Sequence, residues 1–506
     1  MRILIWHGWL LEGSGSNVVT ARTAEAWRAA GHDVVLLCQE RHPERHPWID
    51  ADGLIDGGGP SELTERGSTP GADVGRCALL RPVIGAMLPV FVVDRYEGFD
   101  DVRRFPDLSD EELERYLRAN VDALRAAAEW QGSEIVVTGH AIPGAAIGRR
   151  ALGAGRYLAK IHGSDLEYAV RLQDRYRDLA GEGLGAARAV LGSGSEVLER
   201  CAGLVPEMRD LGRVVAPGVD VDAFRPRPRV EALVDVAGRL ARDPDTARGR
   251  PSVTDALVEG ALEGRDAAAL DAIAGTYDQA VPEPDAAARL RELADGDTPI
   301  VGYLGKLIPQ KGVELALCAH RGLAHDTEML VVGFGSHREW LAALVSALGR
   351  DDRAALGWLR DVGGMPLGDT RPAVEGAHRA VTFTGRLDHR YAPDALAAMD
   401  VMVVPSILHE AFGMVAAEAA AAGALPIVAR HSGLAEVAGA LESAVGRPGM
   451  FSFDPDEDAV DMLATSIDGI LALPSEERDE LRRDVSAFVR REWTWQQTAD
   501  RILAAW

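Results

Sequence analysis

Lysine is nearly absent from this chain of 506 residues, which has three lysines, Lys160, Lys306 and Lys311, beside 51 arginines. Lys306 and Lys311 lie five positions apart in one glycine-containing segment, 305–312. An ammonium is a compact point charge and a guanidinium is a planar fork, so the two do not replace each other at a crowded oxyanion. Compositional drift is the alternative explanation, but residues 303–312 also have the pattern of a strand, a turn and a helix start. The lysine pair therefore predicts a phosphate-binding site.

Cations of both kinds are outnumbered by acids, and the formal net charge is -24. A partner nucleic acid requires a basic face, so this balance argues against nucleic-acid binding. It also disfavours broad attachment to an anionic membrane, although a local basic patch is compatible with docking.

Cysteine is scarce too, with only Cys38, Cys77, Cys201 and Cys318, and their spacing fits no metal site. We expect them to be structural thiols in a reducing compartment. No stretch approaches the roughly 20 apolar residues of a spanning helix, and the short apolar start, residues 1–6, has no pattern of a signal peptide. We therefore expect a cytoplasmic protein with no integral membrane segment.

Strand-like and helix-like segments alternate through residues 1–226, which we expect to form one α/β domain. Residues 41–108 are an exception, since they are rich in Gly, Pro and charge and look irregular, and a convincing helix follows at 110–130. The strands expected in this half are residues 2–6, 33–38, 134–138, 157–161, 189–191 and 213–216.

The composition changes at residues 227–296, which are rich in Ala, Asp, Glu, Arg and Leu and predict a helical insert or linker. The alternation then resumes over 297–490, with strands expected at residues 300–304, 328–332, 381–384, 401–404 and 425–428. The length and this order predict two doubly wound α/β domains separated by the insert. In such sheets ligands bind beyond the carboxyl ends of the strands.

A glycine loop follows the first strand. Gly13 and Gly15 allow the backbone to approach a ligand closely, and Asn17 is the expected N-cap of the next helix, whose free amides favour an anion. The spacing is not that of the dinucleotide fingerprint, so a plain turn between strand and helix remains the alternative.

Two carboxylates flank a second helix start. Glu410 is expected in the loop after strand 401–404, and Glu418 about one turn inside a helix that begins near Met414. With Gly413 between them, they are placed to hold two ends of a polar ligand whose anionic middle meets the backbone amides. Alternatively, Glu410 is an acid at a helix start and Glu418 is a solvated surface charge. The run of alanines after Glu418 favours a buried face, where a carboxylate requires a partner.

Two histidines end neighbouring strands of the first half. His140 follows strand 134–138 and His162 follows strand 157–161. A single histidine is often structural, but two at adjacent strand ends of one sheet favour a functional role. Neither forms a metal-ligand set with Asp165 or Glu167, so we predict no metal.

Together these motifs make the chain resemble the retaining, nucleotide-sugar-dependent glycosyltransferases of family 4, over most of its length except 41–108 and 227–296. The residues that carry the resemblance are Gly13, Gly15, His140, the segment 217–226, Gly305, Lys306, Lys311, Gly312, the segments 332–335, 384–387 and 410–418, and Trp493-Thr494-Trp495. The resemblance implies the GT-B architecture, in which two Rossmann-like domains face a central cleft. It also implies that a C-terminal helix, residues 491–506, returns toward the N-terminal domain.

The resemblance also implies a role for each matching residue. Lys306 and Lys311 would neutralise the diphosphate of the donor. Glu410 would bind hexose hydroxyls and Glu418 the ribose. The amides of Gly15, Gly413, Met414 and Val415 would also contact the diphosphate, and Arg386 and Leu387 would lie near the base. His140 would contact the sugar near the reacting carbon. His162 and Asp165 would lie on the acceptor side.

These residues lead to the hypothesis of a metal-independent retaining hexosyltransferase with a front-face mechanism, no permanently bound cofactor, and a UDP-, GDP- or ADP-sugar as donor. The acceptor would be a sugar, a sugar phosphate or a lipid-linked group. An epimerase of the same architecture and a non-catalytic sugar-nucleotide-binding scaffold are the alternatives. Family members commonly have arginine where Lys306 stands, and a lysine there loses the bidentate fork. A basic stretch at Arg149, Arg150, Arg156 and Lys160 is either an anion-binding feature or a solvated helix face.

Overall fold

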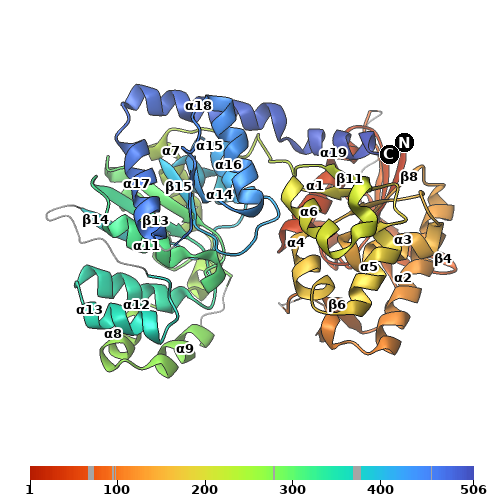
Figure 1. Cartoon of the computed structure of the whole chain (residues 1–506), viewed down its shortest axis with the longest axis horizontal. Helices are drawn as coiled ribbons and strands as arrows, with labels where there is room; N and C mark the ends of the chain where they lie inside the picture. Colours follow the sequence, from red (N-terminus) through yellow and green to blue (C-terminus); the bar gives the residue numbers. More distant parts are fainter. Residues whose placement is uncertain (67–72, 94–95, 97, 277–279, 368–377, 457) are drawn as a thin grey trace. The chain divides into compact units, whose positions relative to one another are not determined.

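Short apolar runs that end at glycine-rich loops become the parallel strands of two separate sheets (Figure 1). The structure is a computed structural model that describes residues 1–66, 73–93, 96, 98–276, 280–367, 378–456 and 458–506. The chain divides into two units, Met1–Gly218 with Trp493–Trp506, and Val219–Glu492. Among the helices in these ranges, none has the length and apolar character needed to cross a membrane.

The first unit is built on a sheet with the strand order β11-β10-β9-β8-β1-β2-β5-β3-β4, in which all neighbours are parallel except β3 and β4. Its strands are β1 (Arg2–Trp6), β2 (Asp33–Leu37), β3 (Ala51–Asp56), β4 (Gly59–Glu65), β5 (Cys77–Pro82), β8 (Ile135–Gly139), β9 (Leu158–Lys160), β10 (Ala189–Gly192) and β11 (Gly212–Val214). A small parallel pair, β6 (Met87–Val90) and β7 (Asp101–Arg104), lies outside this sheet.

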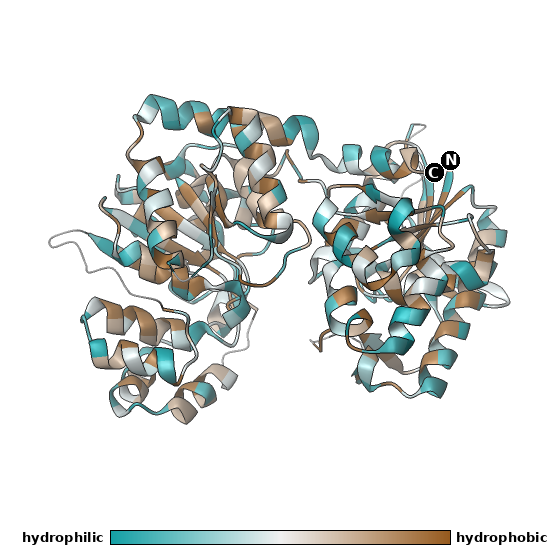
Figure 2. Cartoon of the chain, viewed as in Figure 1, coloured by the Kyte–Doolittle hydropathy of each residue, from teal (hydrophilic) through white to brown (hydrophobic). Residues whose placement is uncertain are grey.

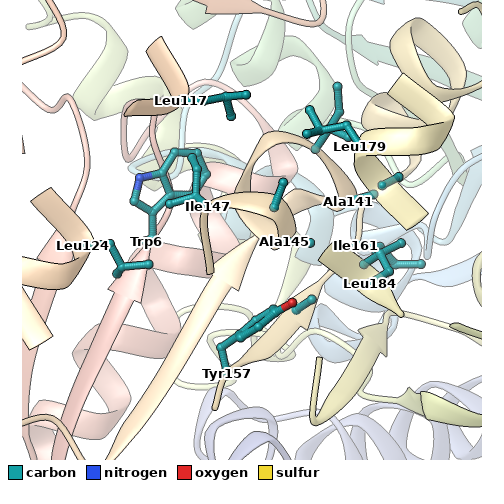
Figure 3. Close-up of a cluster of buried hydrophobic side chains, with 14 of the residues drawn as sticks. Trp6, Leu117, Leu124, Ala141, Ala145, Ile147, Tyr157, Ile161, Leu179 and Leu184 are labelled. Carbon is teal, nitrogen blue, oxygen red and sulfur yellow. The ribbon is translucent and has the colours of Figure 1, made fainter. Parts of the chain in front are cut away.

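Helices cover both faces of this sheet, and strands such as β1 are therefore buried on both sides. Its α-helices are α1 (Gly15–Ala29), α2 (Asp110–Gln131), α3 (Ala145–Leu152), α4 (Gly163–Asp165), α5 (Asp174–Leu184), α6 (Ser195–Leu204) and α19 (Trp495–Ala504). On one face Trp6, Ile147 and Tyr157 pack in the cluster that Figure 3 shows. On the other face α19 packs against α1, where Trp27 Nε1 donates to the carbonyl of Ala499 at 3.1 Å.

The second unit has a six-stranded parallel sheet in the described part of the chain, with the order β14-β13-β12-β15-β16-β17. Its strands are β12 (Ile300–Leu304), β13 (Thr327–Val332), β14 (Arg379–Phe383), β15 (Val401–Val404), β16 (Leu425–Ala429) and β17 (Ser452–Phe453). The strand order reverses between β12 and β15, which is the position where doubly wound sheets bind ligands. Figure 2 shows that hydrophobic residues concentrate in these strands.

The helices of the second unit include those of residues 227–296, which we expected to form an insert between the domains. Here α7 packs against α10 and α14, and buried Arg250 forms a bidentate pair with Glu339 of α12. The α-helices of this unit are α7 (Arg229–Leu240), α8 (Val253–Gly264), α9 (Ala267–Thr276), α10 (Ala286–Asp295), α11 (Val313–Arg321), α12 (Arg338–Gly349), α13 (Arg353–Asp361), α14 (Ala392–Ala397), α15 (Met414–Ala422), α16 (Ser432–Val445), α17 (Ala459–Leu471) and α18 (Ser475–Glu492).

Two expectations about the first half were wrong. Residues 41–108 are not irregular, because their described part holds five strands, β3 to β7, and three of these extend the main sheet. Their glycines and charges hid the pattern, and β4 is an antiparallel edge strand with its side chains toward water. The N-cap of α1 is Ser14 and not Asn17. Asn17 lies in the first turn of α1, and its side chain is buried.

Candidate functional site

The loops that leave β12, β15 and β16 meet at one edge of the second sheet. Gln310 connects the first two loops, since its carbonyl accepts hydrogen bonds from the amides of Ile407 at 3.0 Å and Leu408 at 3.1 Å. Gly312 allows this approach. Its φ of 64° is in the left-handed region, and a Cβ there would lie 2.2 Å from the carbonyl oxygen of Pro405. The backbone therefore holds the two loops together independently of their side chains.

The same approach brings Lys311 and Glu410 into an ion pair across 99 positions of sequence. Lys311 ends the short 3-10 turn η7 (Pro309–Lys311), and Glu410 lies in the loop after β15. Their side chains keep 25% and 22% of their accessible surface, so the pair is within reach of a ligand. The backbone of Glu410 is held by α16, because its amide bonds Ser432 Oγ at 3.1 Å and its carbonyl accepts from Gly433 N at 2.9 Å.

Helix α15 begins beside this ion pair with free backbone donors. Its N-cap is Gly413, with φ 95°, and it has no side chain that caps the helix. The amides of Met414 and Val415 therefore donate no hydrogen bond to any described residue. Glu418 is half-buried one turn further on, on the same side of α15 as Met414. This arrangement offers an ammonium and helix amides to an anion, with carboxylates nearby for hydroxyl groups.

Lys306 follows β12 and Arg386 follows β14, the two strands that flank β13 in the sheet. The Lys306 carbonyl accepts a hydrogen bond from Tyr303 Oη at 2.9 Å, and its side chain is exposed. The guanidinium of Arg386 lies over the ring of Phe334, 5.7 Å from its centroid, whereas Leu387 is buried. An exposed cation stacked on an aromatic ring is chemically suited to a planar base.

The remaining expected residues lie in the first unit. Gly13 has φ 91°, with nothing within 4 Å of the place where a Cβ would stand, and Gly15 is the first residue of α1. His140 and His162 lie together, with ring centroids 4.5 Å apart. Asp165 is fully buried and accepts from the amides of Ala141 at 2.7 Å and His162 at 3.2 Å.

His140 is enclosed, with 1% of its surface exposed. The rings of Trp9 and Phe91 pack on it, at centroid distances of 4.5 Å and 5.0 Å. Its Nδ1 lies 3.5 Å from Asp165 Oδ2, and neither ring nitrogen has a hydrogen-bond partner among the described residues. Its φ of 70° is in the left-handed region, which is uncommon for histidine. Contact of His140 with a sugar therefore requires that Phe91 or Trp9 move aside.

Sequence reasoning missed a buried pair of side chains, one of which, Glu314, comes three positions after Lys311. Glu314, in the first turn of α11, is 0% exposed, and its carboxylate has no hydrogen-bond partner among the residues that the structure describes. His337 Nε2 is 4.0 Å from Glu314 Oε2. Burial raises the pKa of Glu314 to about 7 and lowers the pKa of His337 to about 4. The signal in the sequence is one acid within the otherwise apolar start of α11.

The loop after β16 was missed as well. His431 Nε2 donates to the carbonyl of Ser406 at 2.7 Å, and its ring lies 5.5 Å from that of His409. It thereby connects the loop of β16 to the loop that carries Glu410. The strand order places β16 next to β15, so the position of His431 follows only once that order is known.

Across the described ranges, no group of three or more His, Cys, Asp or Glu residues is arranged to hold a metal ion. The four cysteines are buried and free, as expected for structural thiols. The Lys311 ammonium and the amides at the start of α15 are groups that suit an anion.

Residues 374–487 match the family model described as glycosyl transferases group 1. The chain is 32% identical over 208 residues to the GDP-mannose-dependent alpha-(1-6)-phosphatidylinositol monomannoside mannosyltransferase of Mycolicibacterium smegmatis, covering 39% of this chain and 45% of the relative. It is 28% identical over 179 residues to the 2-deoxystreptamine glucosyltransferase of Streptomyces kanamyceticus, covering 34% and 39%. The matches thus span less than half the length of these two relatives.

Solved structures resemble the whole chain. Sucrose-phosphate synthase from Thermosynechococcus elongatus aligns with a TM-score of 0.56 and 19% identity, over 99% of this chain and 97% of that one. Anabaena HepE in complex with UDP aligns with a TM-score of 0.57 and 13% identity, over 100% and 99%. The chain has the GT-B fold. The expectation of two Rossmann-like α/β domains is therefore confirmed.

Proposed function

We propose that this protein is a retaining, metal-independent hexosyltransferase of glycosyltransferase family 4 that uses a nucleotide diphospho-sugar as donor. The observation that carries the proposal is the Lys311–Glu410 ion pair beside the uncapped start of α15. The match of residues 374–487 to the glycosyltransferase model supports it, and that segment includes Glu410, Gly413 and Glu418.

In this proposal Lys311 and the amides of Met414 and Val415 bind the diphosphate. Breaking the bond between the sugar and the diphosphate leaves negative charge on the departing oxygen, and fixed cations and amides stabilise that charge as it develops. Glu410 then turns from Lys311 to hexose hydroxyls, and Glu418 holds the ribose. Lys306 adds charge to the diphosphate, and Arg386 and Leu387 lie near the base.

The transfer step follows from the same arrangement. The bond from the anomeric carbon to the diphosphate oxygen breaks, and a bond to the acceptor oxygen forms on the same face. The acceptor proton passes to the departing diphosphate oxygen, so the step balances without a separate base. His140 contributes near the reacting carbon once its aromatic cover opens, and His162 and Asp165 lie on the acceptor side.

The first experiment is a donor panel of UDP-, GDP- and ADP-hexoses, with GDP-mannose first because two of the similar proteins are named as GDP-mannose-dependent. Transfer or slow hydrolysis with one donor is expected, and NMR of the product gives its anomeric configuration. An epimerase would instead convert the sugar of the donor without an acceptor. Absence of binding to every donor by calorimetry would contradict the proposal.

Two substitutions test the ion pair itself. Lys311→Ala and Glu410→Gln should each cost about 3 kcal/mol of transition-state stabilisation, roughly a hundredfold in kcat/KM. The matched control is Arg350→Ala, which breaks an exposed ion pair with Glu259 in the same unit and should leave the rate unchanged. Wild-type rates in either site variant would refute the assignment.

A further inference from the structure

The third lysine of the chain is buried without a counter-ion. Lys160 ends β9 and keeps 7% of its surface exposed, between Gly139 of β8 and Leu191 of β10. No carboxylate of the described residues pairs with its ammonium, and no described acceptor takes a hydrogen bond from it. Other buried cations of this chain are paired, as Arg250 is with Glu339. A buried cation without a partner is costly, so its presence requires an explanation.

The neighbours of Lys160 are bases. Lys160 is the last residue of β9, two positions before His162, and it pairs in the sheet with Gly139, which directly precedes His140. His140 completes the group, with its ring 5.9 Å from His7 and 4.5 Å from His162. These side chains follow β1, β8 and β9, which are adjacent in the sheet. The group is therefore a cluster of proton-binding side chains at one edge of the first sheet.

The acids nearest to the cluster are already engaged. Asp165 accepts three backbone hydrogen bonds, from Ala141, His162 and Leu166. Glu167 pairs with Arg200 at 2.7 Å and Arg171 at 3.1 Å. Asp165 Oδ2 also lies 3.5 Å from His140 Nδ1, and no carboxylate of the described residues forms an ion pair with Lys160.

Burial has the expected effect on these groups. It lowers the pKa of Lys160 to about 7 and that of His7 to about 3, and it lowers the pKa of His162 well below its usual value. Burial thus disfavours the charged forms of these three bases. An anion placed among them would restore the charge of Lys160 and form charge-assisted hydrogen bonds.

The other cations of the basic stretch do not compete for this role. Arg150 pairs with Glu182 at 2.9 Å and Glu114 at 3.1 Å, and Arg156 precedes β9, whereas Lys160 ends it. Arg149, Arg150 and Arg156 are exposed, whereas Lys160 is buried.

We propose that Lys160, together with His162, binds an anionic group, a phosphate or a carboxylate, that is carried by the acceptor substrate. This inference rests on the proposed glycosyltransferase function and narrows its acceptor to a charged sugar or sugar-like molecule. Lys160 is a binding residue for specificity and takes no part in breaking the donor bond.

The scarcity of lysine makes a direct test simple. Protein labelled with 13C and 15N at lysine gives three side-chain ammonium signals, and loss of one in Lys160→Arg assigns it. With the donor site saturated by the nucleoside diphosphate that the panel identifies, inorganic phosphate is then titrated. We expect the Lys160 signal to shift and its pKa to rise by a unit or more, while Lys306 and Lys311 remain unchanged. An unchanged Lys160 titration at all phosphate concentrations would overturn the inference.

Transfer assays separate the two anion sources and the two proposals. Hexose 6-phosphates, uronic acids and their neutral parent sugars are compared as acceptors, and either charged class is expected to have the lower KM. In Lys160→Met, KM for the charged acceptor should rise about tenfold or more relative to the neutral one, with partial recovery in Lys160→Arg. Arg156→Met, a control at an exposed residue, should leave KM unchanged for both the charged and the neutral acceptor.

The outcomes are distinct. Equal KM values for charged and neutral acceptors in the wild type would refute the role of Lys160 while donor turnover still supports the proposed function. If Lys160 has only a structural role, its substitution should lower stability and slow transfer to charged and neutral acceptors equally. That result would also refute the proposed binding role of Lys160. Failure to bind any nucleotide sugar would contradict the proposed function itself.

Discussion

Replacing Gly312 by alanine tests whether close contact between two loops builds the proposed donor site. The new Cβ would lie 2.2 Å from the carbonyl oxygen of Pro405, and backbone cannot yield as a flexible side chain can. The left-handed φ of 64° costs an L-residue about 1–2 kcal/mol, and overpacking against the neighbouring loop adds about 1–3 kcal/mol. The sum is about 2–5 kcal/mol of lost stability in the second unit.

The matched control is Gly446→Ala. Gly446 has φ 67° but nothing within 4 Å of its added Cβ, so it carries the backbone cost without the clash. Urea unfolding of both variants, read by fluorescence and circular dichroism, should show the larger loss for Gly312→Ala. Calorimetry with the donor nucleotide should show weaker binding only for Gly312→Ala, because Lys311 is displaced. Equal stability and equal binding in the two variants would refute the reasoning.

Three further predictions follow from buried groups and from the site. Burial raises the pKa of Glu314 in the folded state to about 7, so the folded state binds one more proton than the unfolded state between about pH 4.5 and 7. Stability of the wild type should therefore fall as the pH rises through this range, by up to about 3 kcal/mol relative to Glu314→Gln. Parallel pH profiles of stability for the two proteins would contradict this prediction. The four buried thiols should resist a thiol reagent in the native protein and all react in guanidinium, whereas rapid labelling of the native protein would show that their burial is wrong. Treatment with EDTA should leave transfer unchanged, and loss of activity restored by a divalent cation would refute metal independence.

Much of the proposed donor region could be predicted because its signals are local. Gly413 precedes a helix, Glu410 and Glu418 flank the start of that helix, and two of the three lysines lie five positions apart, all within short segments. Strands β12 and β15 were predicted with their observed bounds because their apolar runs are short and end at turns. The donor and catalytic roles themselves stay predictions.

The prediction of an irregular segment at 41–108 failed for a physical reason. Strand β4 is antiparallel at the edge of its sheet, and its side chains lie in water, so no apolar run marks it. The cap of α1 was misplaced because Ser14 and Asn17 are both good caps. In the structure the Ser14 hydroxyl accepts from the Asn17 amide, and the Asn17 side chain bonds His7 instead.

The sequence by itself determined the α/β alternation, the glycine turns and the lysine scarcity, since each depends on neighbours along the chain. Only the tertiary structure decided that Lys311 pairs with Glu410, that Glu314 lies beside His337, and that Lys160 is buried without an acid. Those facts depend on strand order and on which loops touch. Local propensity contains no information about contacts between residues that are about a hundred positions apart.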